Sequence, residues 1–176
     1  LAATLSANYG IYGPAFELCE NRPKEFGSEE YLDSEKYEIR EWGIQSPESL
    51  QALIGRINRI RKENTALQSD WGLQFHTIDN EQLICYSKST EDFSNIVLVV
   101  ANLDPHHTHS GWLELPVDEW GLDPLRPYQV HDLLSDARYL WQGSKNYVEI
   151  NPRVMPAHVF RLRRRIRTER DFDYFM

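Results

Sequence analysis

The sequence is poor in cysteine, in basic charge and in long apolar runs, and each shortage excludes a class of protein. Its two cysteines, Cys19 and Cys85, are too few for a disulfide framework, which favours a reducing compartment. No apolar run approaches the roughly 20 residues that span a bilayer. Lysine and arginine number 19 against 27 acidic residues, so the net charge is −8. Because nucleic-acid phosphates attract a positive surface, we expect neither nucleic acid nor a membrane as a partner.

The amino-terminal residues also lack the features of a targeting segment. Residues 1–5 have no basic stretch followed by a long apolar one, so no signal peptide is predicted and the expected location is cytoplasmic. The chain begins with Leu1, inside an apolar run that has no start signal, and we therefore expect it to be part of a longer protein. Its 176 residues are 41% hydrophobic and 12% aromatic, which is sufficient for a packed core and excludes wholesale disorder.

The first third of the sequence predicts a helix end, a strand and a long loop in turn. Residues 1–5 have the character of a helix end, and residues 9–12 are predicted to form a short buried strand. A buried strand without alternation is typical of a parallel sheet, yet the sequence contains no second strand of that kind. Residues 19–45 are polar and irregular, and a connection of that length is usually functional.

An amphipathic helix is predicted over residues 47–64. Ser46, Pro47 and Glu48 are the residue types that favour an N-cap, a first helical position and a first turn. Apolar residues then recur with helical spacing and should form the packed face. They are Leu50, Leu53, Ile54, Ile57 and Ile60.

From residue 72 onward the apolar period changes to alternation, which predicts strands. Turn-forming residues such as Asp79-Asn80 and Asn151-Pro152 separate them. The predicted strands are 73–78, 82–88, 96–103, 111–115, 128–133, 138–141, 147–150 and 157–162. Many short strands at this spacing predict a mainly β fold, an antiparallel β-sandwich or barrel of about a hundred residues.

Three histidines close together, His106, His107 and His109, raise the question of a metal site. They follow the turn at Asp104-Pro105, and adjacent histidines on a hairpin rarely converge on one ion. No cysteine or carboxylate completes a tetrahedral set. The sequence therefore predicts a polar loop and no metal site.

Two further patterns have simple structural explanations. His131-Asp132 suggests a catalytic triad, but there is no Gly-x-Ser-x-Gly turn, so a strand residue with a local hydrogen bond is expected. The arginine-rich run 161–167 could contact phosphate. It alternates with Phe160 and Leu162 along a strand, so its arginines should face solvent.

The loop over residues 27–40 mixes hydrogen-bonding side chains with two tyrosines. Because a sugar has hydroxyl edges and an apolar face, this composition is compatible with carbohydrate binding. Its carboxylates could be imagined as an acid and a base, in the pairs Glu29/Glu30 or Asp33/Glu35. Spacing within a loop does not support that assignment, and solvated charge is the expectation.

The order of these elements resembles the end of an α-amylase-type enzyme, in which the last strand and helix of a (β/α)8 barrel precede a C-terminal β-sandwich. Five segments are further similar to one subfamily, the bacterial α-1,4-glucan:maltose-1-phosphate maltosyltransferases: 8–18, 27–37, 102–107, 128–134 and 171–175. The resemblance runs nearly from end to end. It implies two domains, residues 1–68 as the remnant of the catalytic barrel and residues 69–176 as the sandwich.

The resemblance implies a retaining transferase that moves maltosyl from α-maltose 1-phosphate to the non-reducing end of an α-1,4-glucan, as in glycogen-like glucan synthesis. In the family an aspartate forms a covalent maltosyl-enzyme and a glutamate acts as acid and base. Both lie on earlier barrel strands, so this chain is expected to contain no catalytic residue and to be inactive alone. The resemblance further implies no cofactor and a homodimeric parent protein.

Lys36 and Tyr37 are the substrate-binding residues that the resemblance implies. In the family a Lys-Tyr pair in this loop contacts the maltosyl unit away from the cleaved bond, and these two positions match it. Lysine supplies a charged donor for a sugar hydroxyl, and tyrosine supplies a ring with a hydroxyl tip. Such remote contacts help to select maltosyl over glucosyl transfer.

Two other functions stay open. One is a non-catalytic carbohydrate-binding or interaction module, which exposed and paired aromatics on the sandwich would favour; Trp112, Trp120 and Trp141 are the candidates. The other is a fragment of an amylase-like hydrolase or of a trehalose-processing enzyme. The upstream sequence would distinguish these possibilities.

Overall fold

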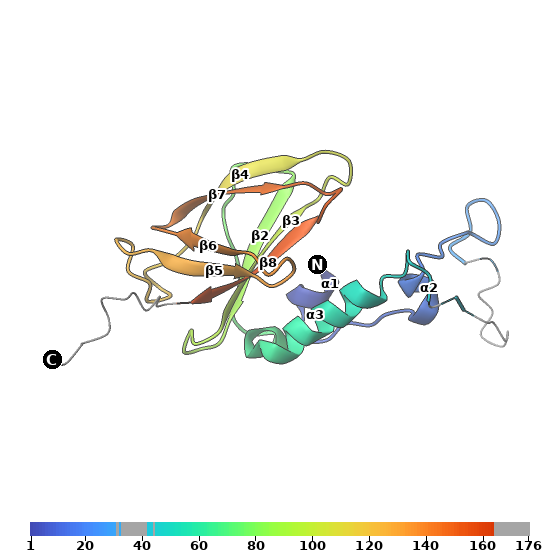
Figure 1. Ribbon diagram of the computed structural model, residues 1–176, viewed down its shortest axis with the longest axis horizontal. Coiled ribbons are helices and arrows are strands. Elements are labelled where there is room, and N and C mark those ends of the chain that lie inside the picture. The colour runs from blue at the N-terminus through green and yellow to red at the C-terminus, as the bar shows by residue number, and fades with distance from the viewer. Residues whose placement is uncertain (31, 33–41, 44, 164–176) are drawn as a thin grey trace. The chain divides into compact units, whose positions relative to one another are not determined.

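The structure is a computed structural model of the chain, and it describes residues 1–30, 32, 42–43 and 45–163 (Figure 1). The described elements are three α-helices, one short 3-10 helix and eight strands. Within the described ranges, no helix has both the length and the apolar composition needed to cross a bilayer.

Two compact units make up the chain, and each is described by itself. Leu1–Ala7 and the residues from Ile60 onward form the first unit, and Asn8–Arg59 form the second. Both ends of the segment 1–68 therefore group with the strands.

The first unit is an antiparallel β-sandwich, which confirms the predicted fold class. Its strands are β1 Leu73–Phe75, β2 Leu83–Ser89, β3 Ile96–Asn102, β4 His109–Glu114, β5 Tyr128–Asp132, β6 Arg138–Trp141, β7 Lys145–Ile150 and β8 Ala157–Arg163. Six of them form a sheet in the order β1-β2-β3-β8-β5-β6, and β4 pairs with β7 in a second sheet. The two sheets face each other (Figure 1).

Strand β1 ends earlier than the predicted residue 78 because the chain changes sheets there. Phe75 still pairs with Tyr86 in the large sheet. Ile78 instead bridges to Leu113 of β4, and the amide of Asp79 donates to the Trp112 carbonyl (3.2 Å). A strand that switches sheets in this way closes one corner of a sandwich.

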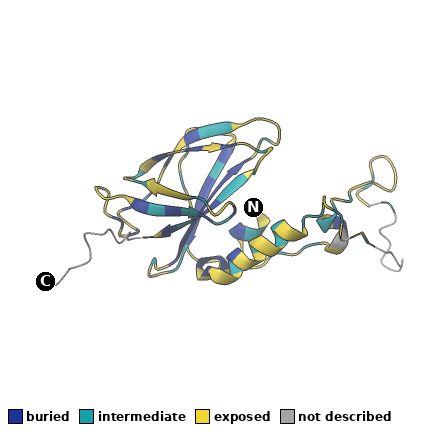
Figure 2. Ribbon diagram, in the orientation of Figure 1, coloured by how far each residue is buried: buried dark blue, intermediate teal, exposed yellow. Residues whose placement is uncertain are grey.

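The main core lies between the two sheets. Its buried residues are Leu83, Cys85, Ile96, Leu98, Val100, Leu113, Leu115, Val117, Trp120, Leu122, Tyr128, Val130, Val148, Ile150, Phe160 and Leu162. Buried positions, dark blue in Figure 2, lie along the strands of the sandwich. Because full burial of one large apolar side chain contributes about 1.5–3 kcal/mol, this cluster is the main source of the stability of the unit.

The opposite face of the large sheet is covered by the 3-10 helix η1, Thr65–Gln68, which lies against β2 and β3. The Ala66 amide donates to Asn95 Oδ1 (3.0 Å), and Asn95 Nδ2 donates to Asn64 Oδ1 (3.0 Å). Every residue of β3 is buried as a result. Coverage of both faces explains why the unbroken apolar run Ile96–Ala101 forms a strand without alternation.

The short helix α1, Ala2–Leu5, is fixed to the same face of the sheet by polar contacts of β2. The hydroxyls of Thr4 and Tyr86 are 2.6 Å apart and share a hydrogen bond. Lys88 is buried, and its ammonium donates to the Leu5 carbonyl (3.3 Å). Burial lowers the pKa of Lys88, which the negative charge of Asp70 partly opposes.

Arg61 holds the segment that follows α1. Its guanidinium donates to three backbone carbonyls, those of Ala3, Ser6 (3.1 Å) and Ala7. The Ala7 amide in turn donates to the Asp70 carboxylate (2.6 Å). These contacts explain why residues 1–7 belong to the sandwich unit.

Helix α3, Gln51–Glu63, begins later than predicted, so the expected cap at Ser46 is wrong. Ser46 Oγ accepts from the Glu48 amide (3.3 Å) and closes a separate turn. The Leu50 amide donates to the Glu17 carbonyl (2.8 Å). Because the Leu50 amide bonds to Glu17 and not to a residue of a preceding helical turn, the helix begins at the next residue, Gln51. On the predicted apolar face, Ile60 is buried while the other positions are half-exposed.

The strand expected over residues 9–12 is not formed, and this prediction is wrong. A buried parallel strand needs neighbouring parallel strands to pair its backbone groups, and the described part of the chain contains none. The Tyr9 hydroxyl donates to Asn58 of α3 instead. The next residues form the short helix α2, Gly13–Glu17, in which Gly13 has a φ of +53°.

The substitution Arg61→Ala should loosen residues 1–7, because three carbonyls lose a charged donor whose hydrogen bonds contribute about 1.5–3 kcal/mol. We expect hydrogen exchange of the Thr4 and Leu5 amides to accelerate by roughly ten- to a hundredfold. The exposed Arg59 of the same helix provides a matched control, and Arg59→Ala should leave these amides unchanged. Equal exchange in Arg61→Ala and the unsubstituted chain would contradict this role.

Candidate functional site

The predicted substrate-binding residues Lys36 and Tyr37 lie outside the described residues. The described part of their loop is an ordered turn. The Lys24 amide donates to the Glu30 carbonyl (2.8 Å), and the Leu32 amide donates to the Arg22 carbonyl (2.7 Å). Glu30 also forms an exposed ion pair with Lys24 (3.2 Å). This carboxylate is therefore on the surface, as expected for solvated charge, while Asp33 and Glu35 lie outside the described residues.

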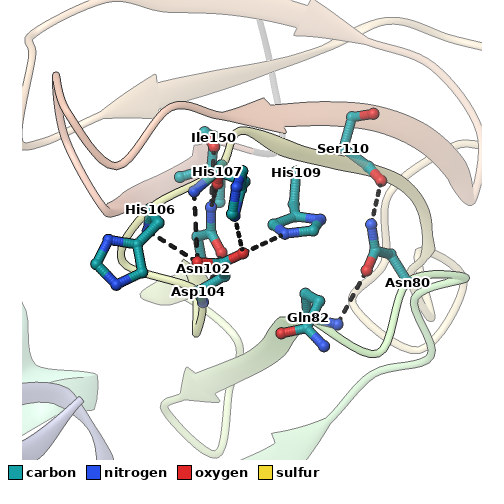
Figure 3. A network of polar contacts seen from close by, with 9 residues as sticks. All are labelled: Asn80, Gln82, Asn102, Asp104, His106, His107, His109, Ser110 and Ile150. Carbon is teal, nitrogen blue, oxygen red and sulfur yellow. Dashed lines mark hydrogen bonds and ion pairs between the residues drawn. The ribbon is translucent and has the colours of Figure 1, made fainter.

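The histidine loop after β3 is organised by the carboxylate of Asp104 (Figure 3). One carboxylate oxygen accepts from the His106 amide (2.8 Å). The other contacts His107 Nδ1 (2.8 Å) and His109 Nε2 (3.0 Å). The His106 amide and the two imidazoles hold the pKa of Asp104 well below its usual range.

Asn102 ties this loop to the small sheet. Its side-chain amide donates to the carbonyls of His107 (2.8 Å) and Ile150 (3.1 Å), and its oxygen accepts from the Asp104 amide (2.9 Å). Figure 3 shows the rings of His107 and His109 next to Asp104, whereas His106 contacts it through the backbone amide. No group of three or more histidine, cysteine or acidic side chains among the described residues is placed to hold a metal ion. The hydrogen bonds of Asn102 and Asp104 give this loop its turn.

The His131-Asp132 pair does not form a catalytic triad. His131 Nε2 contacts the Asp136 carboxylate (2.5 Å), which is the kind of local bond expected. Ser135 Oγ donates to Asp132 (2.5 Å), and His158 Nδ1 contacts the same carboxylate (3.0 Å). Serine and histidine therefore both bind the aspartate, and the geometry lacks the serine–histidine bond that activates a nucleophile.

Asp132 is fully buried and joins β5 to β8. Burial alone would raise the pKa of this carboxyl, but hydrogen bonds from His158, Ser135 and the Leu134 amide outweigh burial and lower the pKa. His158 was missed by sequence reasoning, because no sequence pattern links it to a carboxylate on another strand.

An aromatic cavity lies beside His158. Its volume is about 120 Å³, and it is lined by Tyr139, Trp141, Tyr147, Val148, Glu149, His158 and Phe160. Tyr147 also pairs across the small sheet with Trp112, at a ring-centroid distance of 5.4 Å. Of the tryptophans considered from sequence, Trp112 is exposed, Trp141 is half-buried and Trp120 is in the core.

Two arginines of the predicted basic run lie in the described end of β8. Arg161 is half-buried and Arg163 is exposed. The remainder of the run lies outside the described residues.

The substitution Asp132→Asn should lower the free energy of unfolding by about 1.5–3 kcal/mol, because it removes a charged acceptor of several hydrogen bonds. Since the folded pKa is lowered, this stabilisation is present at neutral pH and is lost as the pH falls through the folded pKa. Urea unfolding at about pH 7 and about pH 3 measures both effects. The exposed Asp118→Asn provides the control. A variant as stable as the unsubstituted chain at neutral pH would contradict the role of Asp132.

Known proteins share both the sequence and the fold. The chain is 47% identical over 168 residues to an alpha-1,4-glucan:maltose-1-phosphate maltosyltransferase of Chlorobaculum tepidum, covering 92% of this chain and 25% of that protein. A Streptomyces coelicolor protein of the same name, numbered 2, is 48% identical, covering 93% and 24% of the two chains. The chain thus spans about a quarter of the length of these curated relatives.

The fold is also that of a solved α-amylase from Anoxybacillus, with a TM-score of 0.52 at 11% identity over 73% of this chain and 25% of that one. The model of the family described as GLGE, C-terminal, matches residues 75–162, which are 88 of the 176 residues. This match extends from β1 to β8 and so covers the sandwich, and the chain belongs to the family described as GLGE, C-terminal.

Proposed function

We propose that this chain is the C-terminal part of a retaining maltosyltransferase, which transfers maltosyl from α-maltose 1-phosphate to the non-reducing end of an α-1,4-glucan. The observation that carries the proposal is the identity of 47% over 92% of the chain with a protein of that name. The similarity includes the loop that contains Lys36 and Tyr37 as well as the sandwich. The sandwich alone would not carry it, because an α-amylase has the same fold.

In the proposed parent protein this chain binds and positions substrate, and the chemistry occurs elsewhere. A retaining mechanism needs a nucleophilic carboxylate and a nearby carboxylic acid with a raised pKa. Among the described residues, the aspartates with a shifted pKa are Asp92, Asp104 and Asp132, and in each case hydrogen bonds lower the pKa. None of these three has the raised pKa of a general acid. The family that this chain resembles has its nucleophile and its acid/base on earlier barrel strands, so we assign both to residues outside this chain.

We assign Lys36 and Tyr37 to the donor site, where they would hold the glucose unit away from the cleaved bond. The proposal follows from their match to the family motif. Two backbone hydrogen bonds before this segment, from Lys24 to Glu30 and from Leu32 to Arg22, support it, because they fix the described residues that precede it. In this proposal the parent protein is a cytoplasmic homodimer that extends a glycogen-like glucan.

A fragment of an amylase-like hydrolase is the alternative that the α-amylase fold would also allow. It predicts hydrolysis of glucan without a phosphorylated donor. The parent protein distinguishes the two by its products, which are inorganic phosphate and a longer glucan for the transferase.

The isolated 176-residue chain should release no phosphate from α-maltose 1-phosphate in the presence of glycogen. The reason is that the proposed nucleophile and acid/base are absent from it. A phosphate assay with the parent protein as positive control provides the measurement. Turnover in the range of ordinary enzymes, ~1–10³ per second, would place the catalytic groups in this chain and contradict the proposal.

In the parent protein, Lys36→Ala should lower kcat/KM for α-maltose 1-phosphate by roughly ten- to a hundredfold, because it removes one charged hydrogen bond of about 1.5–3 kcal/mol. Tyr37→Phe should cost less than Tyr37→Ala, which also removes the ring. The loss should be smaller for a glucosyl donor, which has no second sugar to hold.

Lys24→Ala is the matched control, because this lysine of the same loop forms an exposed ion pair worth ~0–1 kcal/mol. It should leave kcat/KM nearly unchanged. If a folded Lys36→Ala enzyme behaves like Lys24→Ala, Lys36 is only a surface residue and the donor-site assignment is wrong.

A further inference from the structure

The aromatic cavity is lined by residues of β6 and β8 in the large sheet and of β7 in the small sheet. Its floor is Phe160 of β8, which is buried in the core. Three rings surround Phe160. The ring centroids of Trp141 and Tyr139 on β6 lie 5.3 and 6.1 Å from it, and His158 stacks on it at 5.0 Å with an angle of 15°.

The other wall of the cavity comes from β7. Tyr147 and Glu149 both point away from the core, as the alternating burial of β7 requires, and both line the cavity. Tyr147 is 49% exposed and Trp112, its cross-strand partner on β4, is 47% exposed. The cavity therefore continues into an exposed pair of aromatic rings on the small sheet.

The polar groups of the cavity suit hydroxyls better than they suit an anion. The lining of the cavity includes a carboxylate, Glu149, and no lysine or arginine. Over the adjoining Trp112 ring, the Lys145 ammonium lies 5.7 Å from the ring centroid and offers a donor to a sugar hydroxyl. Tyr139 and Tyr147 each carry a phenolic hydroxyl at the edge of a ring. His158 is oriented by Asp132, which contacts its Nδ1, so a ligand would meet the Nε2 nitrogen. Rings with a few oriented donors and acceptors are what a neutral sugar requires.

We propose that the aromatic cavity and the adjoining Trp112–Tyr147 pair form a surface binding site for an α-1,4-glucan chain. The glucan identity of the ligand rests on the proposed function. A volume of about 120 Å³ is small for a ligand pocket, so the cavity holds a single sugar ring and the aromatic pair supports its neighbour. Affinity for a short oligosaccharide is therefore weak.

A weak site of this kind would act on polymers. A glucan held at the sandwich keeps its other chain ends close to the same protein, which raises their effective concentration at the transfer site. The benefit depends on a ligand long enough to reach both places. The site should consequently affect KM for glycogen and leave KM for a short acceptor unchanged.

A second aromatic surface provides an internal control. Trp71 is 86% exposed and lines a separate groove with Leu73 and Phe93. Exposed indole area alone would therefore direct a sugar to Trp71. The arrangement of rings and oriented polar groups directs it to Trp112 and Trp141.

An NMR titration of the 15N-labelled 176-residue chain with maltoheptaose tests the proposed binding site. The indole N–H signals of the tryptophans report which of them the sugar contacts. The signals of Trp112 and Trp141 should shift with a common saturation curve, and those of Trp71 and Trp120 should stay unchanged. Cellohexaose, a β-1,4-linked glucan, should produce much smaller shifts. Shifts at Trp71 alone, no shifts at all, or equal shifts with cellohexaose would each overturn the proposal.

Substitutions at two exposed residues test whether their side chains bind the glucan, and they leave the core unchanged. Tyr147→Ala and Trp112→Ala should each weaken maltoheptaose binding by about two- to tenfold, as expected for the loss of one aromatic contact. Trp71→Ala should not change it. Circular dichroism verifies the fold of each variant, and unchanged affinity in both site variants would overturn the proposal.

The same variants separate this inference from the proposed function. In the parent protein, Tyr147→Ala should raise KM for glycogen and leave phosphate release with a short maltooligosaccharide acceptor unchanged. Absence of glucan binding at the sandwich, with maltosyl transfer intact, would defeat the surface site alone. Absence of maltosyl transfer in the parent protein would defeat the proposed function.

Discussion

The unequal width of the two sheets governs the architecture of this chain. Strands in a sheet lie about 4.8 Å apart, so the two strands β4 and β7 cannot cover the inner face of six. The connection between β4 and β5 compensates on one side, since its Leu115, Val117, Trp120 and Leu122 complete the core. On the β6 side, rings around Phe160 occupy the uncovered area and leave the aromatic cavity. The difference in width between the two sheets thus determines which side of the core the β4–β5 connection covers and on which side the aromatic cavity lies.

Buried polar groups fix the edges of this arrangement. Asp132 joins β5 to β8 through His158, and Asn102 joins the end of β3 to the small sheet through Ile150. Arg61 holds residues 1–7 by their carbonyls. In each case a side chain satisfies groups from distant parts of the chain, because an unpaired buried polar group would be costly. These networks stabilise the sandwich and orient its loops, and none of the three has the geometry of a reacting centre. This is consistent with a chain that binds substrate while another part of the protein reacts with it.

The sequence predicted the strands well because alternation is a local signal. Residues 138–141 form a strand at the predicted bounds, and β3, Ile96–Asn102, differs from its predicted bounds by one residue. Prediction failed where tertiary contacts decide. The Leu50 amide donates to the Glu17 carbonyl, and α3 begins only after Leu50. Residues 9–12 have no parallel strand beside them in the described part of the chain. The Asp132–His158 contact joins residues on different strands, which no spacing rule reveals. Lys36 and Tyr37 were proposed from the resemblance to a family, since composition alone indicated only a polar loop compatible with carbohydrate binding.

The central claim is that this chain contributes binding and that the nucleophile lies outside it. Trapping the covalent intermediate in the parent protein tests this claim most directly. A maltosyl fluoride with a second fluorine beside the reacting carbon forms the glycosyl-enzyme and slows its breakdown, so the label survives digestion and peptide mapping by mass spectrometry. The account predicts a maltosyl label on a carboxylate in a peptide outside these 176 residues. A label on Glu29, Glu30, Asp33 or any other carboxylate of this chain would contradict it.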